Sequence, residues 1–177
     1  MSLGSIHGIL PHMSTTEMFT SPTFGQLDVD GVIDQIASFI GESSDDSYRI
    51  VIGTDSQAKR INGDTEIDFV TAVVVHRIGY GARYFWKRDK QKRKYVLREK
   101  IYTETIKSLE FAEIFVPQIR DRITAAKYDL EIHIDVGPIG PTRDMIKEIV
   151  GMVRGSGYTA RTKPESYGAS SVADRHT

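Results

Sequence analysis

Apolar residues recur along this chain at two spacings, one typical of helices and the other typical of strands. From Asp28 to Gly41 they return every three or four positions, which predicts a helix with one buried face that Asp28 or Asp30 caps. Arg49–Asp55 and Leu130–Asp135 are short runs rich in β-branched residues. Each run predicts a buried strand that carries an aspartate at its C-terminal end.

The chain between these two strands predicts two more strands and a long helix. Ser56–Asp64 contains an Asn-Gly pair and predicts a turn, after which Ile67–Ile78 and Ala82–Lys87 predict strands joined by a second short turn. Three consecutive strands joined in this way form an antiparallel meander. A helical pattern then runs from Tyr95 to about Ile123.

The last third of the chain predicts helix, strand and helix. Pro141 suits the first turn of a helix that ends near Gly155, Tyr158–Thr162 predicts a short strand, and Ala169–His176 predicts a terminal helix. A helical crossover from the meander to the later strands makes those strands parallel to the first one. We therefore expect an α/β fold: a mixed sheet of a three-strand antiparallel meander plus parallel strands, flanked by helices. We expect residues 1–21 to be a loose N-terminal tail and residues 22–177 to be a single domain.

Composition narrows the classes of function. The chain has 177 residues, a net charge of −1 and no cysteine. A near-neutral protein attracts nucleic acid only through a local basic patch. The lack of cysteine excludes disulfides, thiolate metal ligands and thiol catalysis, and it suits the reducing cytoplasm, where we expect the protein to be. No apolar run approaches the ~20 residues of a membrane-spanning helix, so we expect no membrane association.

Asp55 and Asp135 predict a cation site. If their strands are neighbours and parallel, both carboxylates lie at one edge of the sheet, where they repel each other unless a cation lies between them. Oxygen ligands without cysteine favour Mg²⁺ or Mn²⁺ over Zn²⁺. The alternative is that each aspartate caps the turn that follows its strand.

Two further acids extend this set. Glu104 shares a helical row with Ser108 and lies at the margin of the buried face, with Glu99 as the other candidate on the same helix. Asp174 lies in the terminal helix. The alternative for both is an ordinary helix-surface acid, with Glu104 paired to Lys100 or Lys107 and Asp174 paired to Arg175.

A basic segment follows the aromatic residues of the third strand. We predict that it is irregular and contacts a nucleic-acid backbone; the alternative is a solvated loop. Its candidate residues are Lys87, Arg88, Lys90, Lys92, Arg93, Lys94 and Arg98. Thr142 and Arg143 are candidates for phosphate binding, because they lie at the predicted start of a helix; a simple strand-to-helix turn explains them equally well.

Three motifs carry a resemblance to a known family: Ile52-Gly-Thr-Asp-Ser-Gln57, Ile134-Asp-Val-Gly-Pro138 and the ending Ser166–Thr177. In them the chain resembles the bacterial YkuK-like family of ribonuclease H-like proteins. The resemblance implies a ribonuclease H-like fold and a site of four acids, Asp55, Glu104, Asp135 and Asp174, that hold two divalent ions at a scissile phosphate. It assigns Asp55 as the ligand shared by both ions, and Lys163 or His176 as groups for proton transfer or phosphate neutralisation.

The sequence thus predicts a nuclease or nuclease-like phosphodiester hydrolase that depends on Mg²⁺ or Mn²⁺ and acts on RNA, DNA or a hybrid. Two alternatives remain open. One is a nucleic-acid-binding module on the same fold without catalysis. The other is a phosphate-binding or protein-interaction domain.

Overall fold

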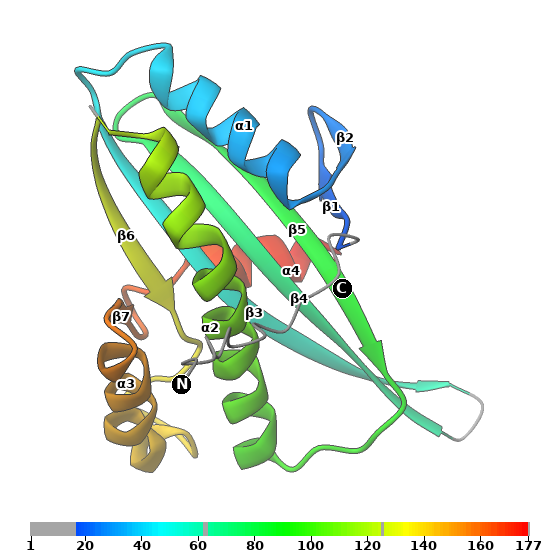
Figure 1. Cartoon of the computed structure of the whole chain (residues 1–177). Helices are drawn as coiled ribbons and strands as arrows, with labels where there is room; N and C mark the ends of the chain where they lie inside the picture. Colours follow the sequence, from blue (N-terminus) through cyan, green and yellow to red (C-terminus); the bar gives the residue numbers. More distant parts are fainter. Residues whose placement is uncertain (1–16, 62–63, 125, 177) are drawn as a thin grey trace, which may run out of the picture.

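The computed structural model describes residues 17–61, 64–124 and 126–176, which build one seven-stranded sheet with helices on both faces (Figure 1). The strand order across the sheet is β2-β1-β5-β4-β3-β6-β7. The strands are β1 (Phe19–Ser21), β2 (Gly25–Leu27), β3 (Ser47–Ile61), β4 (Asp64–Arg77), β5 (Gly81–Gln91), β6 (Lys127–His133) and β7 (Thr159–Arg161). The helices are α1 (Val29–Gly41), α2 (Leu97–Arg122), the 3₁₀ turn η1 (Arg143–Met145), α3 (Ile146–Gly155) and α4 (Gly168–His176).

The sheet has the predicted mixed topology. β3, β4 and β5 pair antiparallel as a meander, and β6 and β7 add parallel strands on the other side of β3. The long helix α2 carries the chain from β5 to β6, which gives β3 and β6 the same direction. The α/β fold class expected from the sequence is confirmed.

Side-chain alternation along the strands divides the molecule into two layers of packing. Ile50 and Ile52 belong to the main core with residues of α1, α2 and α3, whereas Val51 lies against Gly168 of α4. A smaller cluster on the α4 side joins Ala72 to Val172. Three helices therefore cover one face of the sheet and α4 covers the other (Figure 1). Within the described ranges, no helix combines the length and apolar character needed to cross a membrane.

The first helix follows directly from its sequence. Asp28 is the N-cap of α1, and its Oδ1 accepts a hydrogen bond from the Gly31 N–H at 2.8 Å. Four apolar residues of the predicted stripe are buried, and the helix ends at Gly41. The predicted cap and end are both confirmed.

Two strand ends differ from the prediction. β3 continues through the expected turn to Ile61, because its partner β4 pairs with it as far as Ile61↔Asp64. The predicted Asn-Gly turn, residues 62–63, lies outside the described residues. β6 ends at His133, so Asp135 follows the strand, while Asp55 lies well inside β3.

Three other expectations also need correction. Phe19–Ser21 belong to the predicted tail but form β1, because Phe19 is fully buried and Thr20 pairs with Trp86. Residues 1–16 of that tail lie outside the described residues. The basic segment is not irregular throughout, because β5 extends to Gln91 along β4. Pro141 precedes the helix, which begins with η1 at Arg143. The loop before it extends to Thr142, whose hydroxyl accepts a hydrogen bond from the Gly137 N–H.

Candidate acidic site

Asp55 and Asp135 lie together because β3 and β6 are parallel and in register. The last pair of the ladder is Gly53↔His133, and each aspartate lies two residues further along. Alternation along β3 gives Asp55 the face of the sheet that α4 covers, and Asp135, which follows β6, lies beside Ser170 of α4. Together with Ser166 and Ser170 they line one small cavity at this place.

Glu104 is a buried carboxyl near this pair. Only 3% of its surface is exposed, and its Oε1 accepts a hydrogen bond from Ser56 Oγ at 2.7 Å. Burial raises the pKa of Glu104 to about 7; Lys100 and the Ser56 hydrogen bond oppose this, and the charges of Asp55 and Asp135 add to it. The influence of both aspartates on this pKa places three acids within electrostatic reach of one another.

Two lysines supply positive charge to these acids. Lys163 Nζ lies 2.6 Å from Asp135 Oδ1, and Lys100 Nζ lies 3.6 Å from Glu104 Oε1. Asp135 Oδ1 is buried and accepts no hydrogen bond of good geometry from the described residues, so its contact with Lys163 is essentially ionic. Lys100 also donates to the Ser56 carbonyl at 3.2 Å. Both ammonium groups therefore offset the repulsion between the carboxylates.

β3 itself separates Glu104 from Asp55. Thr54 and Ser56 point toward α2, where the Thr54 Oγ1 accepts from Ser108 and the Ser56 hydroxyl donates to Glu104. Asp55, between them in sequence, takes the opposite face. Accordingly, no three His, Asp or Glu side chains among the described residues form a group that could hold a metal ion. Asp174 belongs to α4, but its side chain lies outside the described part, so the four-acid set stays a prediction.

The basic segment is distributed over two faces of the sheet rather than gathered in one patch. Lys87 points toward α2, whereas Arg88 lies 5.5 Å from the Trp86 ring on the α4 side. Several members have acidic partners: Lys87 with Glu17, Arg88 with Asp68, Lys92 with Glu66, Arg93 with Glu99, and Arg98 with Glu148. Lys90 and Lys94 are exposed. The strand alternation of β5 is the physical reason for this division.

The loop at Thr142 and Arg143 uses its polar atoms internally. The Thr142 hydroxyl oxygen accepts a hydrogen bond from the Gly137 N–H at 3.3 Å, and Arg143 is exposed. The α-helix proper begins only at Ile146. Phosphate binding by Thr142 and Arg143 stays a prediction; the turn that begins at Arg143 is a 3₁₀ turn of three residues that leads into α3.

The prediction from sequence missed a buried polar network beside the acidic pair. The carboxylate of Glu131, which is 5% exposed, contacts His133 Nε2 and Arg161 Nε, each at 3.0 Å. His133 Nδ1 accepts the Gly168 N–H at 3.3 Å, which makes Nε2 the donor to Glu131. Burial lowers the pKa of His133, so this neutral tautomer is favoured. The signal was present in the sequence, since polar Glu131 and His133 alternate with Ile132 and Ile134.

His176, the other proton-transfer candidate, lies elsewhere. Its ring stacks on Trp86 at 4.3 Å between centroids, and its Nε2 lies 3.4 Å from the Tyr84 hydroxyl. These contacts attach the end of α4 to β5. Of the two candidates, Lys163 is therefore the one that contacts an acid of the site.

Comparison with known proteins agrees with this architecture. A family model described as Ribonuclease H-like matches residues 31–177. A protein of Bacillus subtilis (strain 168) with the name "Uncharacterized protein YkuK" is 33% identical over 175 residues, which cover 93% of this chain and 99% of that protein. No solved structure matches the chain. With most of its length matched by the family model and by this relative, the chain belongs to the YkuK-like proteins of the ribonuclease H-like family.

Proposed function

We propose that this protein is a nuclease that hydrolyses phosphodiester bonds of RNA, DNA or a hybrid with the help of Mg²⁺ or Mn²⁺. The observation that carries the proposal is the pairing of Asp55 with Asp135, which two parallel strands bring to one cavity. Such a pair of carboxylates is costly without a compensating positive charge. The family likeness adds support, because the same two positions lie in the motifs that resemble ribonuclease H-like proteins.

The residues of the site suit a hard divalent cation. The donors at Asp55 and Asp135 are carboxylate oxygens, the ligands that Mg²⁺ and Mn²⁺ prefer. The buried Asp135 Oδ1 has an ion pair with Lys163 and, among the described residues, no hydrogen-bond donor of good geometry. A lysine ammonium can withdraw where a divalent ion enters. We assign Asp55 and Asp135 as metal ligands, and Glu104 and Asp174 as the further acids of the site.

Each side chain has a chemical task in this proposal. A bound divalent ion would act as a Lewis acid and make a bound water more acidic. Glu104, with its pKa near 7, exchanges a proton readily at neutral pH. Lys163 places a positive charge beside Asp135, where a phosphate would approach the two aspartates. Ser56 orients the Glu104 carboxyl by its hydrogen bond.

The test is metal-dependent cleavage by the Asp55→Asn variant. Labelled RNA, DNA and hybrid duplexes are incubated with the full chain and Mg²⁺ or Mn²⁺. We expect cleavage by the unchanged protein and a loss of about 100-fold or more in the variant, because even outer partners of metal ligands contribute about 10–100-fold. Asp129→Asn is the matched control, since Asp129 is an exposed aspartate on β6. Equal cleavage by Asp55→Asn and Asp129→Asn would contradict the proposal.

A second function, nucleic-acid binding without cleavage, is favoured by one observation. Asp135 and Glu104 already have lysine partners, so two of the three described acids have a positive charge beside them without a metal. Under this alternative, salt-dependent binding is retained while neither metal produces cleavage. Replacing exposed Lys90 and Lys94 by Gln then reduces the slope of log affinity against log salt concentration by about one for each phosphate that these lysines neutralise.

A further inference from the structure

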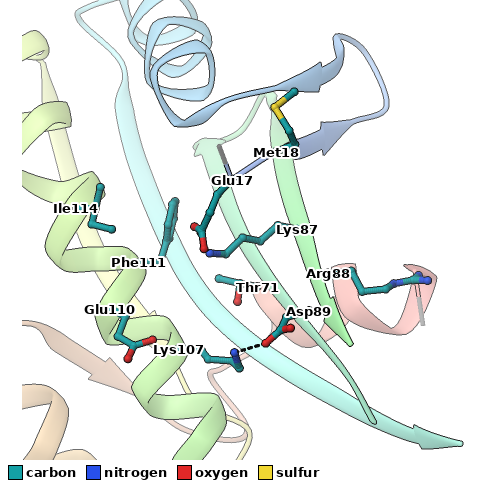
Figure 2. Close-up of a pocket in the computed structure, with 10 residues that line it drawn as sticks. All are labelled: Glu17, Met18, Thr71, Lys87, Arg88, Asp89, Lys107, Glu110, Phe111 and Ile114. Carbon is teal, nitrogen blue, oxygen red and sulfur yellow. Dashed lines mark hydrogen bonds and ion pairs between the residues drawn. The ribbon is translucent and has the colours of Figure 1, made fainter. Parts of the chain in front are cut away.

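A separate cavity lies between α2 and the strands β4 and β5, away from the acidic pair. Its volume is about 250 Å³, just below the roughly 300–1,000 Å³ of typical ligand sites, and Thr71, Phe111 and Ile114 contribute to its walls. In Figure 2, Lys87 and Lys107 enter this cavity from β5 and α2, while Arg88 points away from it. Two cationic groups from different elements thus share one hollow.

Both lysines are largely buried and lie beside aromatic rings. The side chain of each is 21% exposed. Lys87 Nζ lies 5.6 Å from the centre of the Phe19 ring and 5.7 Å from that of Phe111, and Lys107 Nζ lies 5.4 Å from the Phe69 ring. Ammonium groups that are largely shielded from solvent interact more strongly with anions than ammonium groups in water.

The two lysines differ in how their anionic partners are held. Lys107 donates to Asp89, a residue of β5 that the strand ladder fixes in place. Lys87 donates to Glu17, which precedes the first strand and belongs to no helix or strand. Burial would raise the pKa of Asp89, but hydrogen bonds from Lys107 and Gln91 and the charges of Lys107 and Lys87 hold it low. Asp89 therefore balances one positive charge from a position within the sheet, and Glu17 balances the other from a segment outside the sheet.

We propose that this cavity binds a small carboxylate or phosphate anion on Lys87, and that the Glu17 carboxylate is a built-in competitor which the ligand displaces. The charged side chains that line the cavity are Lys87, Arg88, Lys107, Glu17, Asp89 and Glu110, and their formal charges sum to zero. With Glu17 displaced, the remaining five leave one positive charge. Phe111 and Ile114 provide an apolar wall for the body of an organic anion. The same oxyanion chemistry is offered by a free metabolite and by the terminal phosphate of a nucleic acid.

The experiment is an NMR titration of the full chain that follows the backbone amides of Thr71 and Phe111. The probes are acetate, inorganic phosphate, and a dinucleotide with either a 5′-phosphate or a 5′-hydroxyl. We expect Glu17→Gln to bind the anions about fivefold more tightly than the unchanged protein, since a partly exposed ion pair contributes up to about that factor. We expect Lys87→Met to weaken binding by about tenfold, as loss of a charge-assisted hydrogen bond does. Lys147→Met, on the exposed surface of α3, is the matched control.

Comparison of the probes identifies the source of the anion. Binding of acetate and phosphate alike indicates a free small anion, and preference for the 5′-phosphorylated dinucleotide over the 5′-hydroxyl form indicates a nucleic-acid end. A gain of affinity in Glu17→Gln cannot arise from unfolding, so that variant remains informative even if Lys87→Met folds poorly. The proposal is overturned if no probe shifts the pocket amides in either protein, if Glu17→Gln binds no more tightly, or if a folded Lys87→Met binds as well as the unchanged chain.

Discussion

The buried carboxyl of Glu104 makes the stability of the folded protein depend on pH. Burial raises the pKa of this carboxyl from an ordinary 4.5 to about 7. A folded-state pKa above the unfolded one means that the folded protein favours the protonated acid. Its contribution to stability is therefore complete below pH 4.5 and is lost as the pH rises through 7.

The size of the effect follows from the two pKa values. Each pH unit between them corresponds to about 1.36 kcal/mol, so full deprotonation of Glu104 costs about 3 kcal/mol of folding free energy. Between pH 5 and pH 8 the change is about 2–3 kcal/mol, because part of the titration lies below pH 5. Glu104→Gln keeps an acceptor oxygen for Ser56 but carries no ionisable proton. We expect the variant to gain stability relative to the unchanged protein by about 2–3 kcal/mol from pH 5 to pH 8.

Urea denaturation at pH 5, 6, 7 and 8 measures this difference directly. In thermal unfolding it corresponds to a relative shift of roughly 5–10 °C for a chain of this size. Glu110→Gln is the matched control, because Glu110 is an exposed glutamate on the same helix, and we expect its effect to stay within about 0.5 kcal/mol. A stability difference between Glu104→Gln and the unchanged protein that is the same at pH 5 and pH 8 would refute the reasoning.

Two further predictions concern how the helices are held. A Cβ added at Gly168 would lie 2.8 Å from Val51 Cγ1, so we expect Gly168→Ala to destabilise the protein by about 1–3 kcal/mol in urea denaturation. Gly151→Ala in α3 is its control, because it meets open space and should stabilise by about 0.5–1 kcal/mol; a neutral Gly168→Ala would contradict the close approach. Asp28→Ala removes the acceptor for the Gly31 N–H and should cost about 1 kcal/mol, measured in the same way, whereas Asp28→Asn, which keeps a capping oxygen, should cost less.

The elements with strong periodic patterns could be predicted from the sequence. The stripe and cap of α1 specify its limits, and the β-branched runs identify the strands of the meander and β6. The strand ends could not be predicted from local pattern alone. β3 continues past Asp55 through polar residues because β4 supplies hydrogen-bond partners as far as Ile61, and pairing over that distance is a tertiary effect.

The pairing of Asp55 with Asp135 could be predicted from the sequence, whereas the position of Glu104 relative to them could not. That Asp55 and Asp135 lie on neighbouring strands follows from the crossover topology, which the element order implies. Which face Glu104 takes relative to Asp55 depends on how α2 packs on β3, and helical spacing does not contain that information. The division of the basic segment has a similar cause, since its residues alternate between two faces only if the segment is a strand.

The helix that covers the acidic site, α4, is held by His133, which is not one of the four proposed acids. His133 accepts the Gly168 N–H, and Gly168 allows the start of α4 to lie against Val51 of β3. The same helix carries Asp174 and contributes Ser170 to the cavity that Asp55 lines. His133 in turn is oriented by Glu131, whose charge Arg161 balances. Because β6 carries Glu131 and His133 and leads directly to Asp135, this strand positions both Asp135 and the helix that covers the acid pair. Loss of His133 should therefore disturb the site through the position of α4, without removing any carboxylate.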